Sequence, residues 1–218
     1  MFLDRDGTII ADVGFLESLG QVSFFPFTVD AIRALNRAGL PVVVITNQSG
    51  IARGKFTEAF VDETHRFISA RLEAGGARID AYYHCPHHPD GTVESLARAC
   101  DCRKPGRALV DRAAHDVGLD PARSFMVGDR WLDVGLGRAI GGRGILVRTG
   151  VGADEEGQPP AGLSADAVVD NLAAAASWIL RNLPETIGNP QSAINPQSAI
   201  NPQSAINPQS ATRDPQCK

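Results

Sequence analysis

The sequence predicts an α/β fold, with a doubly wound, Rossmann-like parallel sheet and helices on both of its faces. Short apolar runs alternate with amphipathic helical patterns along most of the chain. The run at residues 40–45 is rich in β-branched residues, which is typical of a strand buried on both faces. Polar clusters follow the apolar runs directly, and parallel sheets bind ligands beyond the carboxyl ends of their strands. We therefore expect the functional site at that edge of the sheet.

The individual elements follow from the same patterns. Strands are expected at residues 1–3, 40–45, 80–84, 124–127 and 144–147. Helices are expected at residues 29–38, from Thr57 onward, and at 107–117, 131–140 and 172–183. Thr57 is an N-cap and Gly39 a C-terminal stop. The first strand is shorter than the usual 5–6 residues or so, so either the natural start lies upstream or the central strand is clipped at a cost in stability.

Composition and charge exclude several classes of protein. The 218 residues carry a formal net charge of −4, whereas a general nucleic-acid binder would present a basic face. No stretch approaches the roughly 18 consecutive apolar residues of a membrane span. The first residues do not resemble a secretory signal, because acidic residues stand where a basic region and an apolar run belong. We expect a cytoplasmic protein without nucleic-acid or membrane partners, whose four cysteines are metal ligands or free thiols.

The last part of the chain is expected to be a disordered tail. From Asn189 the sequence Asn-Pro-Gln-Ser-Ala-Ile repeats with a period of six residues. One isoleucine per unit cannot build a core, and the recurring prolines are incompatible with a helix or a central strand. Solenoid units are also longer, at about 20 residues or more. We therefore divide the chain into one folded domain at residues 1–184 and a tail at residues 185–218.

Two polar clusters follow the first two expected strands. Asp4 and Asp6 lie two positions apart in Asp-Arg-Asp-Gly-Thr, where one carboxylate can act as a nucleophile or as a ligand of Mg²⁺. The same pattern occurs in calcium loops and in simple turns. The second cluster offers a hydroxyl and backbone amides to an anion, or else forms a capped turn. It consists of Thr46, Asn47, Gln48, Ser49 and Gly50.

Two further clusters add a cation and a second pair of acids. Lys104 follows Arg103 and precedes a proline, which favours an extended backbone and can fix the ammonium on a phosphate. The alternative is an ordinary pair of basic surface residues. Asp129 and Asp133 follow the strand expected at residues 124–127 and can complete a Mg²⁺ site. Asp129 can also be only the N-cap of the next helix.

In this order the four clusters resemble the haloacid dehalogenase-type phosphatase superfamily over residues 1–149. The resemblance implies that Asp4 attacks phosphorus to form an aspartyl-phosphate, and that Asp6 is the general acid and base. It also implies that Mg²⁺ is held by the Asp4 carboxylate, the Asp6 backbone carbonyl and Asp129, with Asp133 in support.

A group of cysteines and histidines precedes the third polar cluster. Cys85, His87, Cys100 and Cys102 offer three thiolates and an imidazole, the ligand set of a closed tetrahedral zinc site. The loop between them has few hydrophobic anchors and would gain order from a structural metal. The alternatives are reduced cysteines in a loop, or a disulfide between Cys100 and Cys102 that would close a small ring. His88 is expected to be a solvated spare histidine.

This motif resembles one family of the superfamily, the D-glycero-D-manno-heptose-1,7-bisphosphate 7-phosphatases. The similarity lies in Cys-Pro-His-His-Pro, in Cys-Asp-Cys-Arg-Lys-Pro, and in Thr-Asn-Gln-Ser-Gly-Ile-Ala-Arg-Gly from Thr46. The related histidinol-phosphatase domain shares the zinc ligands but tends to have a shorter loop than the one here, where Cys100 follows His87 by thirteen positions. The implied reaction is removal of the 7-phosphate from a heptose bisphosphate. The alternatives are hydrolysis of histidinol phosphate or another small phosphate ester, and a non-catalytic zinc-stabilised binding module.

The resemblance also implies where the substrate and the cofactors bind. No large cap domain is expected, so a flap and the zinc-stapled loop at residues 85–102 would enclose the sugar. Mg²⁺ would be catalytic and Zn²⁺ structural, in a monomer that acts on a small sugar phosphate. Thr46 and Lys104 would hold the transferring phosphoryl group. Contacts with the rest of the substrate would come from Asp12, Val13, Gly14, Phe15, Asn47, Gln48, Ser49, Arg103 and Arg130.

Overall fold

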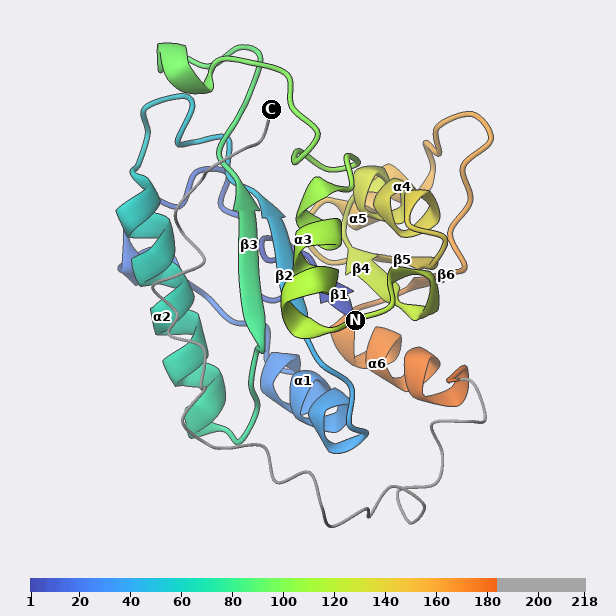
Figure 1. Ribbon diagram of the computed structural model, residues 1–218. Helices are drawn as coiled ribbons and strands as arrows, with labels where there is room; N and C mark the ends of the chain where they lie inside the picture. Colours follow the sequence, from blue (N-terminus) through green and yellow to red (C-terminus); the bar gives the residue numbers. More distant parts are fainter. Residues whose placement is uncertain (184–218) are drawn as a thin grey trace.

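A parallel six-stranded sheet runs through residues 1–183, the part of the chain that the computed structural model describes (Figure 1). The strands are β1 (Phe2–Leu3), β2 (Val43–Asn47), β3 (Ala81–Cys85), β4 (Phe125–Gly128), β5 (Arg143–Val147) and β6 (Ala167–Val169). Their order across the sheet is β3-β2-β1-β4-β5-β6, and all of these pairs are parallel. This is the strand order of a doubly wound sheet, so the predicted fold class is confirmed. The tail expected at residues 185–218 lies outside the described residues.

Helices connect the strands and begin and end close to the expected positions. They are α1 (Thr28–Arg37), α2 (Glu58–Ala74), α3 (Ala108–Val117), α4 (Trp131–Ala139), α5 (Gly152–Glu156) and α6 (Leu172–Arg181). Short 3-10 turns lie at η1 (Leu19–Gln21), η2 (Glu94–Leu96) and η3 (Pro121–Arg123). The N-cap at Thr57 is confirmed, because its side chain accepts a hydrogen bond from the backbone N–H of Phe60 at 3.2 Å. Gly39 follows α1 with a φ of 74°, which supports its role as a helix stop.

The helices cover both faces of the sheet because successive strand residues point to opposite faces. Leu3 and Val44 point into one apolar layer, against which α1, α2 and α6 pack. Phe2, Val43 and Met126 point into the other layer, together with apolar residues of α3 and α4. The continuous apolar runs in the sequence are therefore explained by burial on two sides.

The central strand β1 is as short as the sequence predicts, yet it is firmly paired. Phe2 and Leu3 are fully buried, so each side chain contributes roughly 1.5–3 kcal/mol to folding. Phe2 pairs with Val43 of β2 on one side and with Met126 of β4 on the other. Hydrogen bonds from the Val43 N–H to the Met1 carbonyl (2.9 Å) and from the Asp4 N–H to the Val127 carbonyl (2.8 Å) extend the ladder. The pairing of β1 thus brings Asp4 to the centre of the sheet's carboxyl edge.

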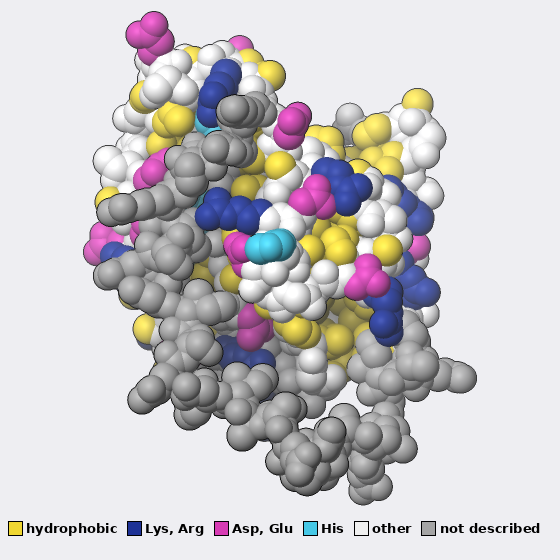
Figure 2. Space-filling model, viewed as in Figure 1, with side chains coloured by type: hydrophobic (Ala, Val, Ile, Leu, Met, Phe, Trp, Pro, Cys, Tyr) yellow, Lys and Arg dark blue, Asp and Glu magenta, His cyan; other side chains and the backbone are white. Residues whose placement is uncertain are grey.

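The described surface carries charged side chains of both signs. Basic and acidic side chains are interspersed over the described part of the face that Figure 2 shows. Within residues 1–183, no helix combines the length and the apolar character that crossing a membrane requires.

Candidate active site

The carboxylates of the site lie beyond the carboxyl ends of β1 and β4, the neighbouring strands at which the strand order of the sheet reverses. From β1 the chain continues to β2 on one side, and β4 lies next to β1 on the other side. In doubly wound sheets the ligand crevice opens at this switch point. Asp4 follows β1, and Asp129 follows β4, with Asp133 in the first turn of α4. One carboxylate oxygen from each of these buried aspartates lies within 4.8 Å of the others.

A buried lysine joins two of these carboxylates. The Lys104 Nζ lies 2.8 Å from Asp4 Oδ1 and 2.7 Å from Asp133 Oδ1, and the lysine side chain is only 1% exposed. Burial alone would lower the pKa of Lys104, but the charges of Asp133 and Asp4 outweigh it and raise the pKa above its ordinary value. The ammonium therefore stays charged and offsets part of the negative charge of the cluster.

The convergence of three carboxyl groups makes the cluster a candidate site for a cation. Burial, with nearby carboxylates in support, raises the pKa of Asp4 to about 6 and that of Asp129 to about 8. Asp129 Oδ2 accepts a hydrogen bond from the Val151 N–H at 3.0 Å, whereas Asp129 Oδ1 is buried without a hydrogen-bond partner in the described chain. A buried carboxylate oxygen without a partner is costly. Hard oxygen ligands of this kind suit Mg²⁺, so the residues present fit this ion.

Two glycines make room for Asp129. A Cβ atom on Gly7 or on Gly150 would lie 2.1 Å from Asp129 Oδ2, and both glycines have a positive φ. The Thr149 hydroxyl donates to the Gly7 carbonyl at 2.6 Å and ties the two glycine loops together. Sequence reasoning missed the loop at residues 149–151, since its only signal is a glycine after the apolar run of β5.

The carboxyl group of Asp6 points to a different set of partners. The Arg5 Nη2 donates to Asp6 Oδ2 at 2.9 Å, and the Gln48 Nε2 donates to the same oxygen at 2.9 Å. Gln48 Nε2 also lies 2.8 Å from the hydroxyl of Thr46, which is buried. The structure therefore brings Asp6, Gln48 and Thr46 together beside Asp4. Sequence reasoning missed Arg5, whose only signal is a basic residue between two acids at a buried strand end.

The other predicted residues of the second and third clusters meet where β2 faces the loop after β3. Asn47 Oδ1 accepts a hydrogen bond from the Lys104 N–H at 3.0 Å, and Asn47 Nδ2 donates to the Lys104 carbonyl at 3.4 Å. Asn47 thus holds the lysine backbone. Ser49 is half-buried. Arg103 Nη1 is buried and has no hydrogen-bond partner within residues 1–183, so this cationic group can receive an anion.

The expected flap is a turn that contacts the start of α4. Asp12 Oδ1 accepts a hydrogen bond from the Gly14 N–H at 2.8 Å, and Asp12 Oδ2 lies 3.4 Å from Arg130 Nη2. Arg130 Nη1 also lies 3.9 Å from a carboxylate oxygen of Glu155 in α5. Val13 and Phe15 are the large apolar side chains that the described chain leaves exposed, at 45% and 37%. Their exposure leaves them available to cover a ligand.

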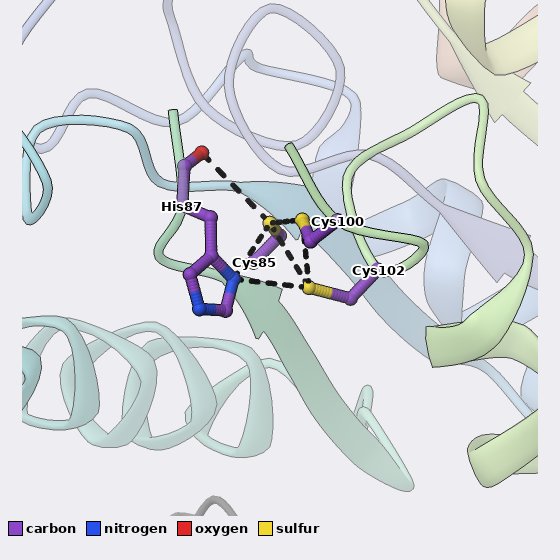
Figure 3. A group of neighbouring side chains, drawn as sticks. All are labelled: Cys85, His87, Cys100 and Cys102. Carbon is purple, nitrogen blue, oxygen red and sulfur yellow. Dashed lines mark hydrogen bonds between the residues drawn. The ribbon is translucent and has the colours of Figure 1, made fainter. Parts of the chain in front are cut away.

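The predicted zinc ligands converge on one point, as Figure 3 shows. The sulfur atoms of Cys85, Cys100 and Cys102 lie 3.2–3.5 Å apart. His87 Nδ1 lies 3.3 Å from the Cys102 sulfur and 3.8 Å from the Cys85 sulfur. The sulfurs are too far apart for a disulfide, which requires about 2.05 Å. Three thiols and one imidazole nitrogen around a common centre fit a tetrahedral zinc ion.

One expectation for this loop is wrong. His88 is half-buried rather than fully solvated, because its side chain is 18% exposed. Arg53 Nη2 lies 3.3 Å from both ring nitrogens, and the ring also accepts a hydrogen bond from the Asp90 N–H at 3.1 Å. The ring is covered because the loop packs against the segment after β2. The N–H groups of Thr92 and Val93 in the loop donate to the carbonyl of Ala52 in that segment. Figure 1 shows these two segments on the same side of the molecule.

Comparison with known proteins places the chain in a family. A model of the HAD-hydrolase-like family matches residues 101–175. The chain is 40% identical over 192 residues to the D-glycero-beta-D-manno-heptose-1,7-bisphosphate 7-phosphatase of Escherichia coli K12, covering 88% of this chain and 94% of that protein. The Yersinia pestis protein of the same name is 37% identical over 186 residues, covering 85% and 91%.

Solved structures agree with the sequence relatives. The crystal structure of D,D-heptose 1,7-bisphosphate phosphatase from B. bronchiseptica, complexed with magnesium and phosphate, is similar with a TM-score of 0.74. It is 34% identical, and the match covers 83% of this chain and 97% of that one. The fold and the aspartate cluster thus define a haloacid dehalogenase-like hydrolase. Within that class, the chain belongs to the D-glycero-β-D-manno-heptose-1,7-bisphosphate 7-phosphatase family.

Proposed function

We propose that this chain removes the 7-phosphate of D-glycero-β-D-manno-heptose 1,7-bisphosphate in a Mg²⁺-dependent reaction, through an aspartyl-phosphate. The observation that carries the proposal is the buried cluster of Asp4, Asp129 and Asp133 around Lys104 at the switch point of the sheet. The relatives' names supply the substrate and its β-anomer.

Asp4 is oriented for nucleophilic attack. The Arg5 N–H (2.7 Å) and the Lys104 Nζ (2.8 Å) both contact Asp4 Oδ1. Asp4 Oδ2 is therefore the oxygen that would attack phosphorus as the bond to the sugar O7 breaks. Asp6 would give its proton to the leaving sugar oxygen. It would then take a proton from the water that attacks the phosphorus of the aspartyl-phosphate, which releases inorganic phosphate and restores Asp4.

The charged groups around Asp4 would stabilise the phosphoryl oxygens. The carboxylates of Asp4 and Asp129 and the Asp6 backbone carbonyl would hold Mg²⁺, with Asp133 in support. When bound, the ion would neutralise part of the negative charge that the substrate brings into the cluster. Lys104 would supply a second positive charge, and the Thr46 hydroxyl a hydrogen bond, to the same phosphoryl group.

A structural Zn²⁺ held by Cys85, His87, Cys100 and Cys102 would fix the loop that carries Lys104. Cys102 stands two residues before this lysine, and Asn47 holds the lysine backbone from the side of β2. A loop shaped by the metal would therefore hold the lysine where it reaches Asp4. Three cysteines that lie close together and form no disulfide also suit a reducing compartment such as the cytoplasm.

The rest of the substrate would lie between the flap and the zinc loop. We propose that Arg103 contacts the second phosphate, since its Nη1 is a buried cation without a partner in the described chain. Arg130 would contact the sugar from the other side, at the point where it meets the flap residue Asp12. The remaining contacts would come from Val13, Gly14, Phe15 and Ser49. The side-chain amides of Asn47 and Gln48, also expected to contact the substrate, are instead hydrogen-bonded within the protein.

Phosphate release from three esters, measured side by side with and without Mg²⁺, tests the proposal. They are the β-anomer of heptose 1,7-bisphosphate, its α-anomer and histidinol phosphate. We expect the highest kcat/KM for the β-anomer. A higher value for histidinol phosphate would contradict the substrate, and no Mg²⁺-dependent release from any ester would favour a binding module. Asp4→Asn should abolish turnover while the thermal unfolding transition is retained, and a fully active Asp4→Asn variant would contradict the mechanism.

A further inference from the structure

We propose that Arg5 is a positioning residue, which holds the carboxyl group of Asp6 in the orientation that acid–base catalysis requires. The inference rests on the proposed function, because it assumes that Asp6 transfers protons to and from the substrate. It adds a side chain that lies between the two aspartates and takes no part in the mechanism described above.

The geometry of the contact is that of a paired arginine and carboxylate. Arg5 Nε lies 3.2 Å from both carboxylate oxygens of Asp6, and Arg5 Nη2 lies 3.1 Å from Oδ1 and 2.9 Å from Oδ2. The Arg5 side chain is 2% exposed, whereas that of Asp6 is 24% exposed. A planar guanidinium that contacts both oxygens fixes the rotation of the carboxyl group as well as its position. Asp6 is thus held from the buried side and remains open to solvent on the other.

Gln48 closes a ring with this pair. Its Oε1 accepts a hydrogen bond from Arg5 Nη2 at 3.0 Å, and its Nε2 donates to Asp6 Oδ2 at 2.9 Å. The same Nε2 donates to the Thr46 hydroxyl at 2.8 Å. Both ends of the glutamine amide are therefore used, and the position of Asp6 is tied to the threonine proposed to hold the phosphoryl group.

Two histidines lie on the side of Arg5 that faces away from Asp6. His65 Nε2 of α2 lies 3.5 Å from Arg5 Nη1, and the ring of His84 from β3 lies 6.0 Å from that of His65. Burial, together with the charge of Arg5, lowers the pKa of His65 far below its ordinary value. A neutral His65 ring does not repel the guanidinium. With Asp62 these histidines form a group that could hold a metal ion, but the charge of Arg5 beside His65 opposes a cation there.

The inference predicts a dependence on the leaving group. Breaking the bond to a sugar oxygen needs a proton from Asp6, whereas p-nitrophenolate is stable enough to leave without one. Hydrolysis of the aspartyl-phosphate needs Asp6 as a base whichever ester formed it. A misplaced Asp6 therefore slows both steps with the heptose bisphosphate, but only the second step with p-nitrophenyl phosphate.

Arg5→Met tests the inference in the full chain with Mg²⁺. The substitution removes the guanidinium and keeps an unbranched, apolar stem. We expect kcat for the heptose bisphosphate to fall by about 10²-fold, as for loss of general acid–base catalysis, with little change in KM. With p-nitrophenyl phosphate we expect a burst of about one nitrophenolate per chain, followed by slow turnover. Arg107→Met is the matched control, because Arg107 also contacts both oxygens of an aspartate, Asp111, but at an exposed position. It should retain the wild-type kinetics.

Arg5→Lys keeps the positive charge and covers the case in which Arg5→Met fails to fold. A single ammonium cannot fix the carboxyl plane, so we expect the same burst with a smaller loss of kcat. An equal loss on both esters without a burst, or kinetics like those of Arg107→Met, would overturn the inference. A raised KM with unchanged kcat would also overturn it, since Arg5 would then bind substrate. A wild type that hydrolyses neither ester would overturn the proposed function and this inference with it.

Discussion

Replacing Gly7 by alanine should displace the proposed Mg²⁺ ligand Asp129. The new Cβ would lie 2.1 Å from Asp129 Oδ2, whereas ordinary contacts begin at 3.4 Å, so the two groups must separate by about 1.3 Å. A misplacement of about 1 Å at a reaction centre can lower the rate by about 10²-fold. We expect kcat/KM to fall by about this factor, with weaker Mg²⁺ binding.

The backbone cost of this substitution can be measured separately with Gly118→Ala. Gly118 has a φ of +71°, close to the +77° of Gly7, but a Cβ on Gly118 would meet nothing within 4 Å. The positive φ alone should cost each variant about 1 kcal/mol, or about 2–4 °C in Tm for a domain of this size, and the contact with Asp129 should add to the loss in Gly7→Ala. Scanning calorimetry measures the loss of stability in each variant, and phosphate release at saturating Mg²⁺ measures the difference in kcat/KM between them. If the two variants had kcat/KM values within about 3-fold of each other, the steric argument for Asp129 would be refuted.

Three further predictions concern the charges and metals of the site. Lys104→Met should lower kcat by about 10²–10³-fold through loss of electrostatic stabilisation, whereas exposed Lys55 replaced by methionine should give wild-type rates in the same assay. Burial raises the pKa of Asp129 to about 8, so the metal-free folded chain binds more protons than the unfolded chain, and stability falls as pH rises toward that value. Mg²⁺ competes with those protons, so its thermal shift should be larger at about pH 8.5 than at about pH 6.5, and the reverse order would contradict a carboxylate site. Elemental analysis should find about one zinc per chain, and Cys100→Ser should lower both that content and Tm, whereas unchanged values would remove Cys100 from the ligand set.

The larger elements of the fold are predictable because burial leaves a strong pattern in the sequence. β2 and β5 are apolar runs that only a two-sided sheet can bury. β6 and α5 leave no such pattern, since β6 has three half-buried residues at the sheet edge and α5 has five residues rich in acids. The position of β6 depends on its parallel pairing with β5, in which Val147 lies opposite Val169, and α5 meets the end of β5 through the ion pair of Arg148 with Glu156. A single-sequence pattern does not carry that information.

The candidate site also contains residues that the sequence predicts and residues that it does not. Asp4, Thr46 and Asp129 stand at or next to the ends of strands, so parallel pairing alone brings them to one edge. The role of Arg5 depends on the direction of its side chain after the turn that follows β1. Its partners Gln48 and His65 are 43 and 60 positions away in the sequence, and no spacing rule connects them. The need for a glycine at position 7 cannot be predicted from the sequence either, because the contacting residue, Asp129, follows a different strand.

The pairing of β1 also determines when the site can exist during synthesis. Phe2 needs Met126 as its neighbour in the sheet, and Asp129 follows Asp4 by 125 positions in the chain. At about 5–20 residues per second, a ribosome needs roughly 6–25 s to make that segment. Until then, the apolar residues of β1 lack one of their two partner strands. Asp4 is therefore made well before the residues of β4 that complete its catalytic surroundings, so the appearance of activity would report the closing of the sheet's centre.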